Sequence, residues 1–107
     1  MHVANVSRRS DHDLMCGLAG LVARDHATTA ALLAHLAEVD HRKLFRPAGF
    51  PSMFAYCVGE LNFSEDIAFK RIRAARAARR FQGILPALAE GRLTLSGVVL
   101  LARHLTH

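Results

Sequence analysis

Residues 65–81 read EDIAFKRIRAARAARRF, and they form the best-supported helix of the chain. Alanine and arginine are both strong helix formers. Ser64 can cap the first turn, and Glu65 and Asp66 place negative charge where the helix dipole favours it. The sequence therefore predicts a helix from Glu65 to about Phe81.

This helix also carries the excess charge of the protein. The eleven residues Lys70 to Arg80 hold six positive charges, no negative charge and four alanines. Residues 1–69 contain six Lys or Arg against eight Asp or Glu, whereas residues 70–107 contain eight against one. A positive field concentrated in one helix indicates a polyanion as partner.

The cations gather mainly on one side of the expected helix. At about 100° per residue, Arg73, Arg76 and Arg80 fall within about 60° of one another. The opposite side collects apolar residues: Ile67, Ala74, Ala78 and Phe81. The candidate DNA-binding residues are Lys70, Arg71, Arg73, Arg76, Arg79 and Arg80. If these cations neutralise about five or six phosphates, the logarithmic salt slope of binding is near −5.

A second interpretation gives the same arginines no ligand. They could be a solvated face, or they could pair with Glu38 and Asp40 of the preceding long helix. Glu65 and Asp66 favour this interpretation, because they occupy the tip that a recognition helix inserts between phosphates. Phe69 favours it too, because it shares the arginine face and needs something to cover it.

The segment before the cationic helix completes a helix-turn-helix pattern. A short helix is expected from Ser52 to Leu61, followed by a turn at residues 62–64 in which Asn62 suits a left-handed conformation. Ala68 and Ile72 are the expected inward positions of the second helix. The seven aromatic residues all lie between Phe45 and Phe81, and we interpret them as core rather than as base-stacking groups.

The spacing of apolar residues predicts that the amino-terminal part of the chain is also helical. Apolar residues recur at helical intervals at Leu14, Leu18, Leu21, Leu32, Leu36 and Val39. We expect residues 1–10 to be disordered and residues 11–46 to form one long helix, or two helices joined near residues 25–28. Such a stripe cannot be buried within a small domain, so its exposed part needs a second copy or further chain.

Prolines and glycines divide the carboxyl-terminal part. Pro47 and Pro51 interrupt the helical pattern, and a short helix is expected to end at Gly91 before Thr94 caps the last one. No segment alternates as a strand would. The predicted fold is all-α: a long N-terminal helix followed, over residues 51–107, by a small bundle with a helix-turn-helix-like core.

Several classes of function find no support in the residues. Cys16 and Cys57 lie far apart, and no histidine or cysteine pair has metal-ligand spacing, so we expect no metal and no cofactor. No nucleophile, phosphate loop or carboxylate pair indicates a catalytic site. Free cysteines and the lack of an apolar stretch long enough to span a bilayer predict a cytoplasmic protein without a membrane partner.

The motifs LLAHLAEVD, SMFAYCVGEL, RIRAARAARRF and LAEGRLTL carry a family resemblance. Over residues 30–106 the chain resembles the amino-terminal helical region of a bacterial family of HNH endonucleases. The resemblance implies a helical region that accompanies a nuclease domain, whose histidines, asparagine and metal site have no counterpart in these residues. Nuclease activity is thus implied for the family and not for this polypeptide.

The central segment is also similar, more distantly, to the helix-turn-helix region of ParB-type partition proteins. The correspondence covers residues 64–72, 84–90, 91–93 and the helix capped by Thr94. Asn62 replaces the usual glycine, and Glu65 and Asp66 replace polar or basic residues.

Together these observations lead to one hypothesis and one alternative. The hypothesis is a helical module that binds double-stranded DNA and has no catalytic site of its own. The alternative is an interaction module that forms a homodimer through its N-terminal helix and has no role with nucleic acid.

Overall fold

The computed structural model describes residues 3–105, which are helical and contain no strand, so the all-α prediction is confirmed. A short 3-10 helix precedes five α-helices. Their bounds are η1 Val3–Arg8, α1 Asp11–Arg42, α2 Met53–Gly59, α3 Glu65–Arg80, α4 Ile84–Ala89 and α5 Leu95–Leu105.

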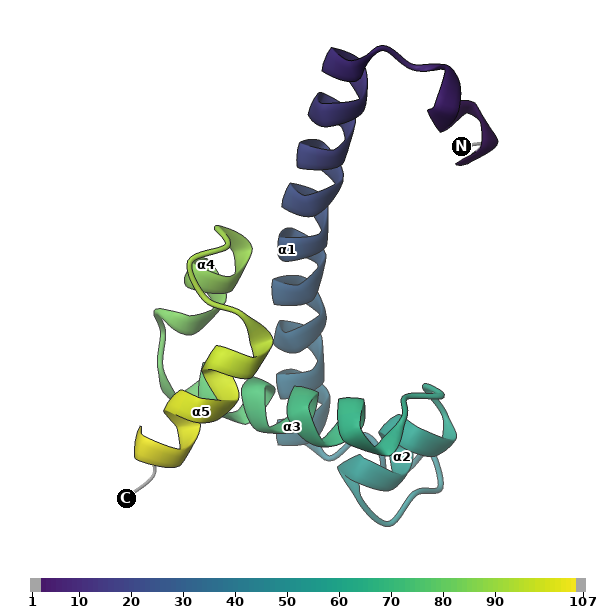
Figure 1. The fold of residues 1–107 in the computed structure, drawn as a ribbon. Helices are drawn as coiled ribbons and strands as arrows, with labels where there is room; N and C mark the ends of the chain where they lie inside the picture. Colours follow the sequence, from purple (N-terminus) through teal and green to yellow (C-terminus); the bar gives the residue numbers. More distant parts are fainter. Residues whose placement is uncertain (1–2, 106–107) are drawn as a thin grey trace.

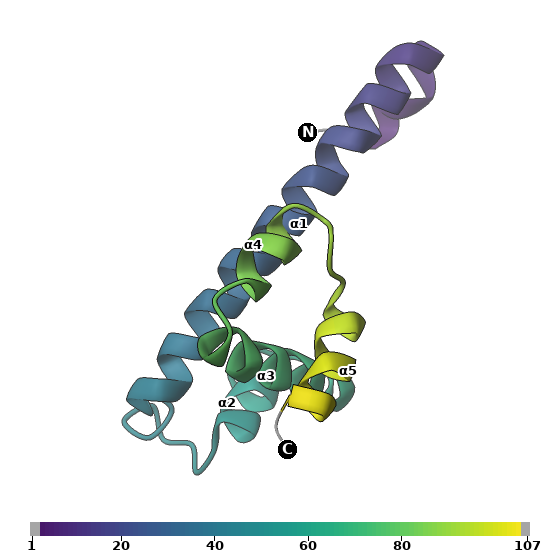
Figure 2. The same cartoon turned by 90° about the vertical axis from the view of Figure 1, so that its left-hand side faces the viewer.

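Helix α1 gives the molecule its elongated shape. It runs without a break for 32 residues, which at 1.5 Å per residue is about 48 Å. The amino-terminal half projects beyond the other helices, and only the carboxyl-terminal half packs against them (Figures 1 and 2). The radius of gyration is therefore 16.6 Å, compared with about 13 Å for a compact chain of this length.

Helix α3 is the centre of the packed part. It crosses the carboxyl-terminal end of α1, with α2 near one of its ends and α5 near the other (Figure 1). Helix α4 lies along α1 (Figure 2). The α3 residues that lie in this core are mostly alanines: Ala68, Ile72, Ala74, Ala75, Ala77 and Ala78. Their small side chains let the neighbouring helices approach the α3 backbone closely.

One hydrophobic core includes residues of α1, α2 and α5. Leu33 of α1, Cys57 of α2 and Val98 of α5 are completely buried in it. Burial raises the pKa of the Cys57 thiol, with the nearby Asp40 carboxylate adding to the shift. The carboxyl-terminal half of α1 thus belongs to the same packing unit as α2 to α5.

The helix starts follow the capping residues in the sequence. At four helix starts, a backbone N–H donates to the hydroxyl oxygen of the residue three positions earlier, at 3.0 to 3.2 Å. The four accepting residues are Ser10, Ser52, Ser64 and Thr94. Asn62 has a φ of 58° and Gly91 one of 78°, so both turns use the left-handed conformation. The predicted inward positions Ala68 and Ile72 are buried.

Three boundaries differ from expectation. Residues 11–42 form one helix, which ends four residues early because Lys43 adopts a left-handed φ of 55° and donates its N–H to the Asp40 carbonyl. Helix α2 ends at Gly59 rather than at Leu61. Val3–Arg8 form a 3-10 helix where disorder was expected, and Val6 lies against the Leu14 and Leu18 side of α1; residues 1 and 2 lie outside the described range.

The close packing around α3 predicts that larger side chains are not tolerated there. Ala75→Leu should lower the free energy of unfolding by about 1–3 kcal/mol, because its new atoms have no space in a filled core. Ala27→Leu, at an exposed position of α1, is the matched control and should change it by less than about 0.5 kcal/mol. Urea unfolding followed by circular dichroism measures both, and equal stability of the two variants would contradict the packing described here.

Candidate nucleic-acid interface

The six cations of α3 do not form one patch. Because α3 contacts other helices on several sides, its charged residues emerge through the gaps that these neighbours leave. Arg73, Arg76 and Arg80 line one hollow, together with Ala77 and Ala102. Arg71 lines a different hollow, which it shares with Asp25 and His26 of α1. The common face predicted for Arg73, Arg76 and Arg80 is therefore present.

Arg76 forms a bidentate ion pair with Asp40 of α1. Its Nε and one terminal nitrogen donate to the two carboxylate oxygens of Asp40 at 2.8 and 3.1 Å. This hydrogen bond raises the pKa of Arg76, with the Asp40 charge also contributing and burial opposing the shift. The Arg76 side chain nevertheless stays 60% exposed. Pairing with α1 carboxylates, the second interpretation of the sequence, thus applies to this residue.

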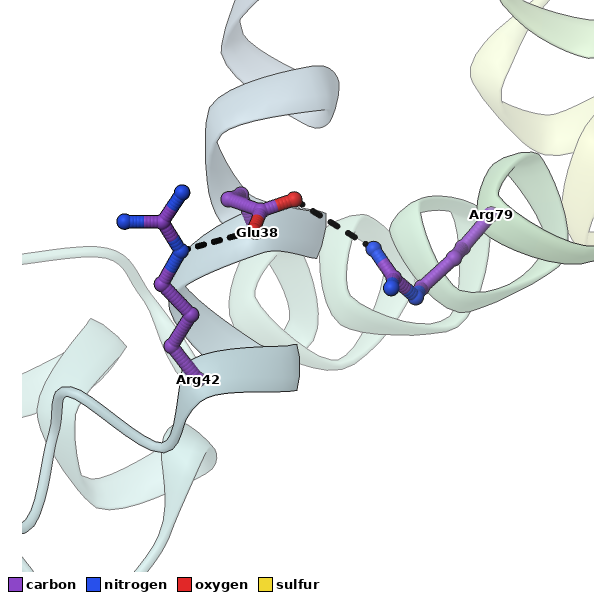
Figure 3. Close-up of polar contacts among 3 residues, drawn as sticks. All are labelled: Glu38, Arg42 and Arg79. Atoms are coloured by element: carbon purple, nitrogen blue, oxygen red, sulfur yellow. Dashed lines mark hydrogen bonds and ion pairs between the residues drawn. The ribbon is translucent and has the colours of Figure 1, made fainter.

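Glu38 accepts from two arginines at once (Figure 3). Arg42, one turn further along α1, donates to one carboxylate oxygen at 2.7 Å, and Arg79 of α3 donates to the other at 3.3 Å. The Arg42 hydrogen bond is the main reason why the pKa of Glu38 lies below its ordinary value. Glu38 is therefore ionised at neutral pH, and the pairs weaken only as pH falls through that lowered pKa. One carboxylate between two guanidinium groups leaves a net positive charge here.

Lys70 and Arg71 are held locally. Lys70 pairs with Asp66 on the preceding turn of α3 at 3.1 Å. The guanidinium of Arg71 lies 4.7 Å from the centroid of the Phe63 ring. The ion pair with Asp66 orients Lys70, and the cation–π contact with Phe63 orients Arg71.

Arg73 and Arg80 form no ion pair with any carboxylate of residues 3–105, and their guanidinium groups lie over aromatic rings. Arg73 is 5.3 Å from the centroid of Phe69, and Arg80 is 5.5 Å from that of Phe81. The Nε of Arg73 is buried and finds no hydrogen-bond acceptor among the residues described. Arg73 and Arg80, together with Arg76, border a hollow of about 330 Å³. We call Arg73, Arg76 and Arg80 the arginine face.

A second hollow adjoins the arginine face on the side of α2. It measures about 300 Å³ and is lined by Phe54 of α2 and Phe69 of α3, with Arg73 and Arg76. Phe54 is 40% exposed and Phe69 is 48% exposed. Interpreting every aromatic residue as core therefore missed these two. The exposure of Phe54 follows from Met53 and Cys57, whose four-residue spacing fixes the inward side of a seven-residue helix.

The described part of the chain contains no metal-ligand cluster and no disulfide. No three His, Cys, Asp or Glu side chains within it gather as metal ligands. Cys16 is exposed and Cys57 buried, and neither is in a disulfide. Among the helices described, none combines the length and the apolar character needed to cross a bilayer.

Comparisons with known proteins do not extend this picture. No family model matches the chain, and no curated protein and no solved structure is significantly similar to it. The arguments about function consequently rest on the site itself.

The Arg76–Asp40 pair should contribute modestly to stability, since Arg76 is exposed while Asp40 is largely covered. Arg76→Ala is expected to lower the free energy of unfolding by about 1 kcal/mol or less. Arg80→Ala, which removes the same charge without breaking an ion pair with Asp40, should have a smaller effect. Thermal unfolding of both variants tests this order, and a larger loss for Arg80→Ala would contradict the assigned pairing.

Proposed function

We propose that this chain is a nucleic-acid-binding helical module that contacts the phosphate backbone through the arginine face. The observation that carries the proposal is the convergence of Arg73, Arg76 and Arg80 on one hollow of α3. A guanidinium group donates in a fixed fork that suits phosphate oxygens. Double-stranded DNA is the first ligand to test, as the helix-turn-helix order of α2 and α3 indicates.

The internal ion pairs leave this role open to the arginines. Arg76 and Arg79 are paired but remain 60% and 44% exposed. Asp40 uses the Nε and one terminal nitrogen of Arg76, which leaves the other terminal nitrogen for a phosphate oxygen while the pair stays in place. Arg73 and Arg80 face aromatic rings and are available without breaking an ion pair to a carboxylate.

Membership of an HNH endonuclease or ParB-type family stays part of this proposal, since no comparison links the chain to either family. A region that holds DNA would bring a neighbouring nuclease domain to its substrate. The proposal for the arginine face is binding alone, and it includes no catalytic step. A cytoplasmic location fits a DNA-binding role and belongs to the same proposal.

The salt dependence of duplex binding tests the proposed function. Three arginines that neutralise about three phosphates give a logarithmic slope near −3, or roughly a fiftyfold loss of affinity from 50 to 200 mM salt. This replaces the steeper slope expected when all six cations act together. Replacing Arg73, Arg76 and Arg80 with Ala should weaken binding and flatten the slope, as measured by fluorescence anisotropy of a labelled duplex.

Two controls separate a local from a general charge effect. One variant removes three positive charges at exposed positions elsewhere: Arg8→Ala, Arg46→Ala and Arg92→Ala. It should bind nearly as the unaltered chain does. The Arg73→Ala/Arg80→Ala variant spares the Arg76–Asp40 pair, and circular dichroism checks that it is folded. Equal weakening by both triple variants would overturn the arginine face as the binding site.

A second candidate function is self-association, and a different observation favours it. The projecting half of α1 leaves large apolar side chains 41 to 67% exposed: Leu14, Met15, Leu18, Leu21 and Val22. A patch of this kind on a free helix marks an interaction surface. We propose a second copy of the chain as its occupant.

In an antiparallel pair of α1 helices, negative charges of one copy face positive charges of the other. Asp13, Gly17, Gly20 and Arg24 recur at helical spacing and form one line beside the leucines. A two-fold axis between Gly17 and Gly20 places Asp13 of each copy opposite Arg24 of the other. The open space around Gly20 allows close approach of the two backbones there, whereas the Arg9 side chain lies beside Gly17. A parallel pair would bring equal charges together.

Sedimentation equilibrium tests the antiparallel pair. Asp13→Arg and Arg24→Asp should each weaken the dimer, because each places like charges across the interface, and the double variant should restore it. Leu18→Glu should give a monomer, while Ala23→Glu, on the opposite side of α1, should not. A chain that is monomeric at all concentrations, or a dimer unaffected by Leu18→Glu, would contradict this interface.

A further inference from the structure

We infer that the hollow between α2 and α3 binds unpaired nucleobases, so that the module prefers single-stranded nucleic acid to duplex. The inference rests on the proposed function and deepens it, because the phosphates would still lie on the arginine face. What the hollow adds is two phenylalanine side chains beside guanidinium groups.

The two rings come from different helices and border the same space. Phe54 lies in the first turn of α2, and Phe69 follows one turn after the start of α3. Both are at least 40% exposed, although α2 and α3 pack against one another. The other aromatic residues among those described are buried or partly buried: Phe45, Phe50, Tyr56, Phe63 and Phe81. Phe54 and Phe69 are thus the most exposed aromatic rings among the described residues; Arg73 lies over one face of Phe69, so a base would stack on the other face.

Charge decides what kind of ligand suits these rings. Arg73 and Arg76 line the same hollow as the phenylalanines, and Arg80 continues the positive charge into the adjoining one. The buried Nε of Arg73 is a donor without an acceptor among the described residues. An apolar protein partner would cover the rings and leave this charge unmatched. A nucleic-acid strand supplies both an aromatic base for the rings and an anionic backbone for the arginines.

The same surface is poorly suited to reading an intact duplex. Bases in a duplex are stacked on one another, so their faces cannot reach Phe54 or Phe69. Glu65 and Asp66 stand at the exposed amino-terminal turn of α3, which a recognition helix would push between phosphates. Electrostatic repulsion there disfavours insertion into the major groove. A flexible single strand can follow the arginines and avoid this acidic turn.

Three probes of equal length and label test the inference by fluorescence anisotropy. They are an oligothymidylate of about twelve nucleotides, within the usual range of site sizes, an abasic strand with the same phosphates, and a duplex. The oligothymidylate should bind at least about tenfold more tightly than the abasic strand, since stacking on an aromatic ring contributes about that factor per base.

The variants separate stacking from charge. Phe54→Ala/Phe69→Ala should reduce oligothymidylate affinity to the level of the abasic strand and leave the salt slope unchanged. Phe54→Leu/Phe69→Leu keeps an apolar surface without an aromatic face and should lose most of the same preference. Leu44→Ala, at a similarly exposed apolar residue elsewhere, should have no effect. Circular dichroism confirms that each variant is folded.

The outcomes distinguish failure of base stacking from failure of phosphate binding. If oligothymidylate and abasic strand bind equally, or if the phenylalanine variants keep the preference, the inference is overturned and phosphate binding by the arginine face stands. A duplex bound more tightly than the single strand also overturns it. If none of the three probes binds, the proposed function fails, and this inference fails with it.

Discussion

The close packing of helices around the alanines of α3 is the constraint on which the structure depends. Alanines at positions 68, 74, 75, 77 and 78 are buried, and the helices around them form a single core that reaches Leu33 of α1 and Val98 of α5. Larger residues at these positions would separate the neighbouring helices. Because the inward positions are small, the arginines between them are left at the gaps and edges of the packing. One run of sequence therefore fixes the core and the distribution of charge together.

The ion pairs between α1 and α3 give the arginines two roles. Arg76 and Arg79 tie α3 to the last turns of α1 through Asp40 and Glu38. The same two side chains remain exposed enough to meet an anion. Such pairs orient the guanidinium groups before a ligand arrives, which lowers the conformational entropy lost on binding. Arg73 and Arg80 are oriented differently, by the rings of Phe69 and Phe81.

Local signals in the sequence predicted most of the fold. Ser10, Ser52, Ser64 and Thr94 begin helices because each hydroxyl satisfies a backbone N–H that has no partner within the helix. The continuity of α1 could not be decided, since Asp25 and Thr28 interrupt its apolar stripe but cost little on an exposed helix face. For the site, helical spacing correctly grouped Arg73, Arg76 and Arg80. The same spacing places Arg71 about 160° from Arg73 and so outside this group. It could not separate Phe54 from the core, because that outcome depends on which side of α2 the neighbouring helices cover.

The central claim is that a nucleic acid is held jointly by the arginine face and the hollow beside it. The most direct test is to follow the amide and side-chain NMR signals of the whole chain during titration with oligothymidylate. The account predicts that the largest shifts fall on Phe54, Phe69 and Arg73, with smaller ones along the rest of the arginine face. Shifts confined to the projecting half of α1, or no shifts at all, would contradict it.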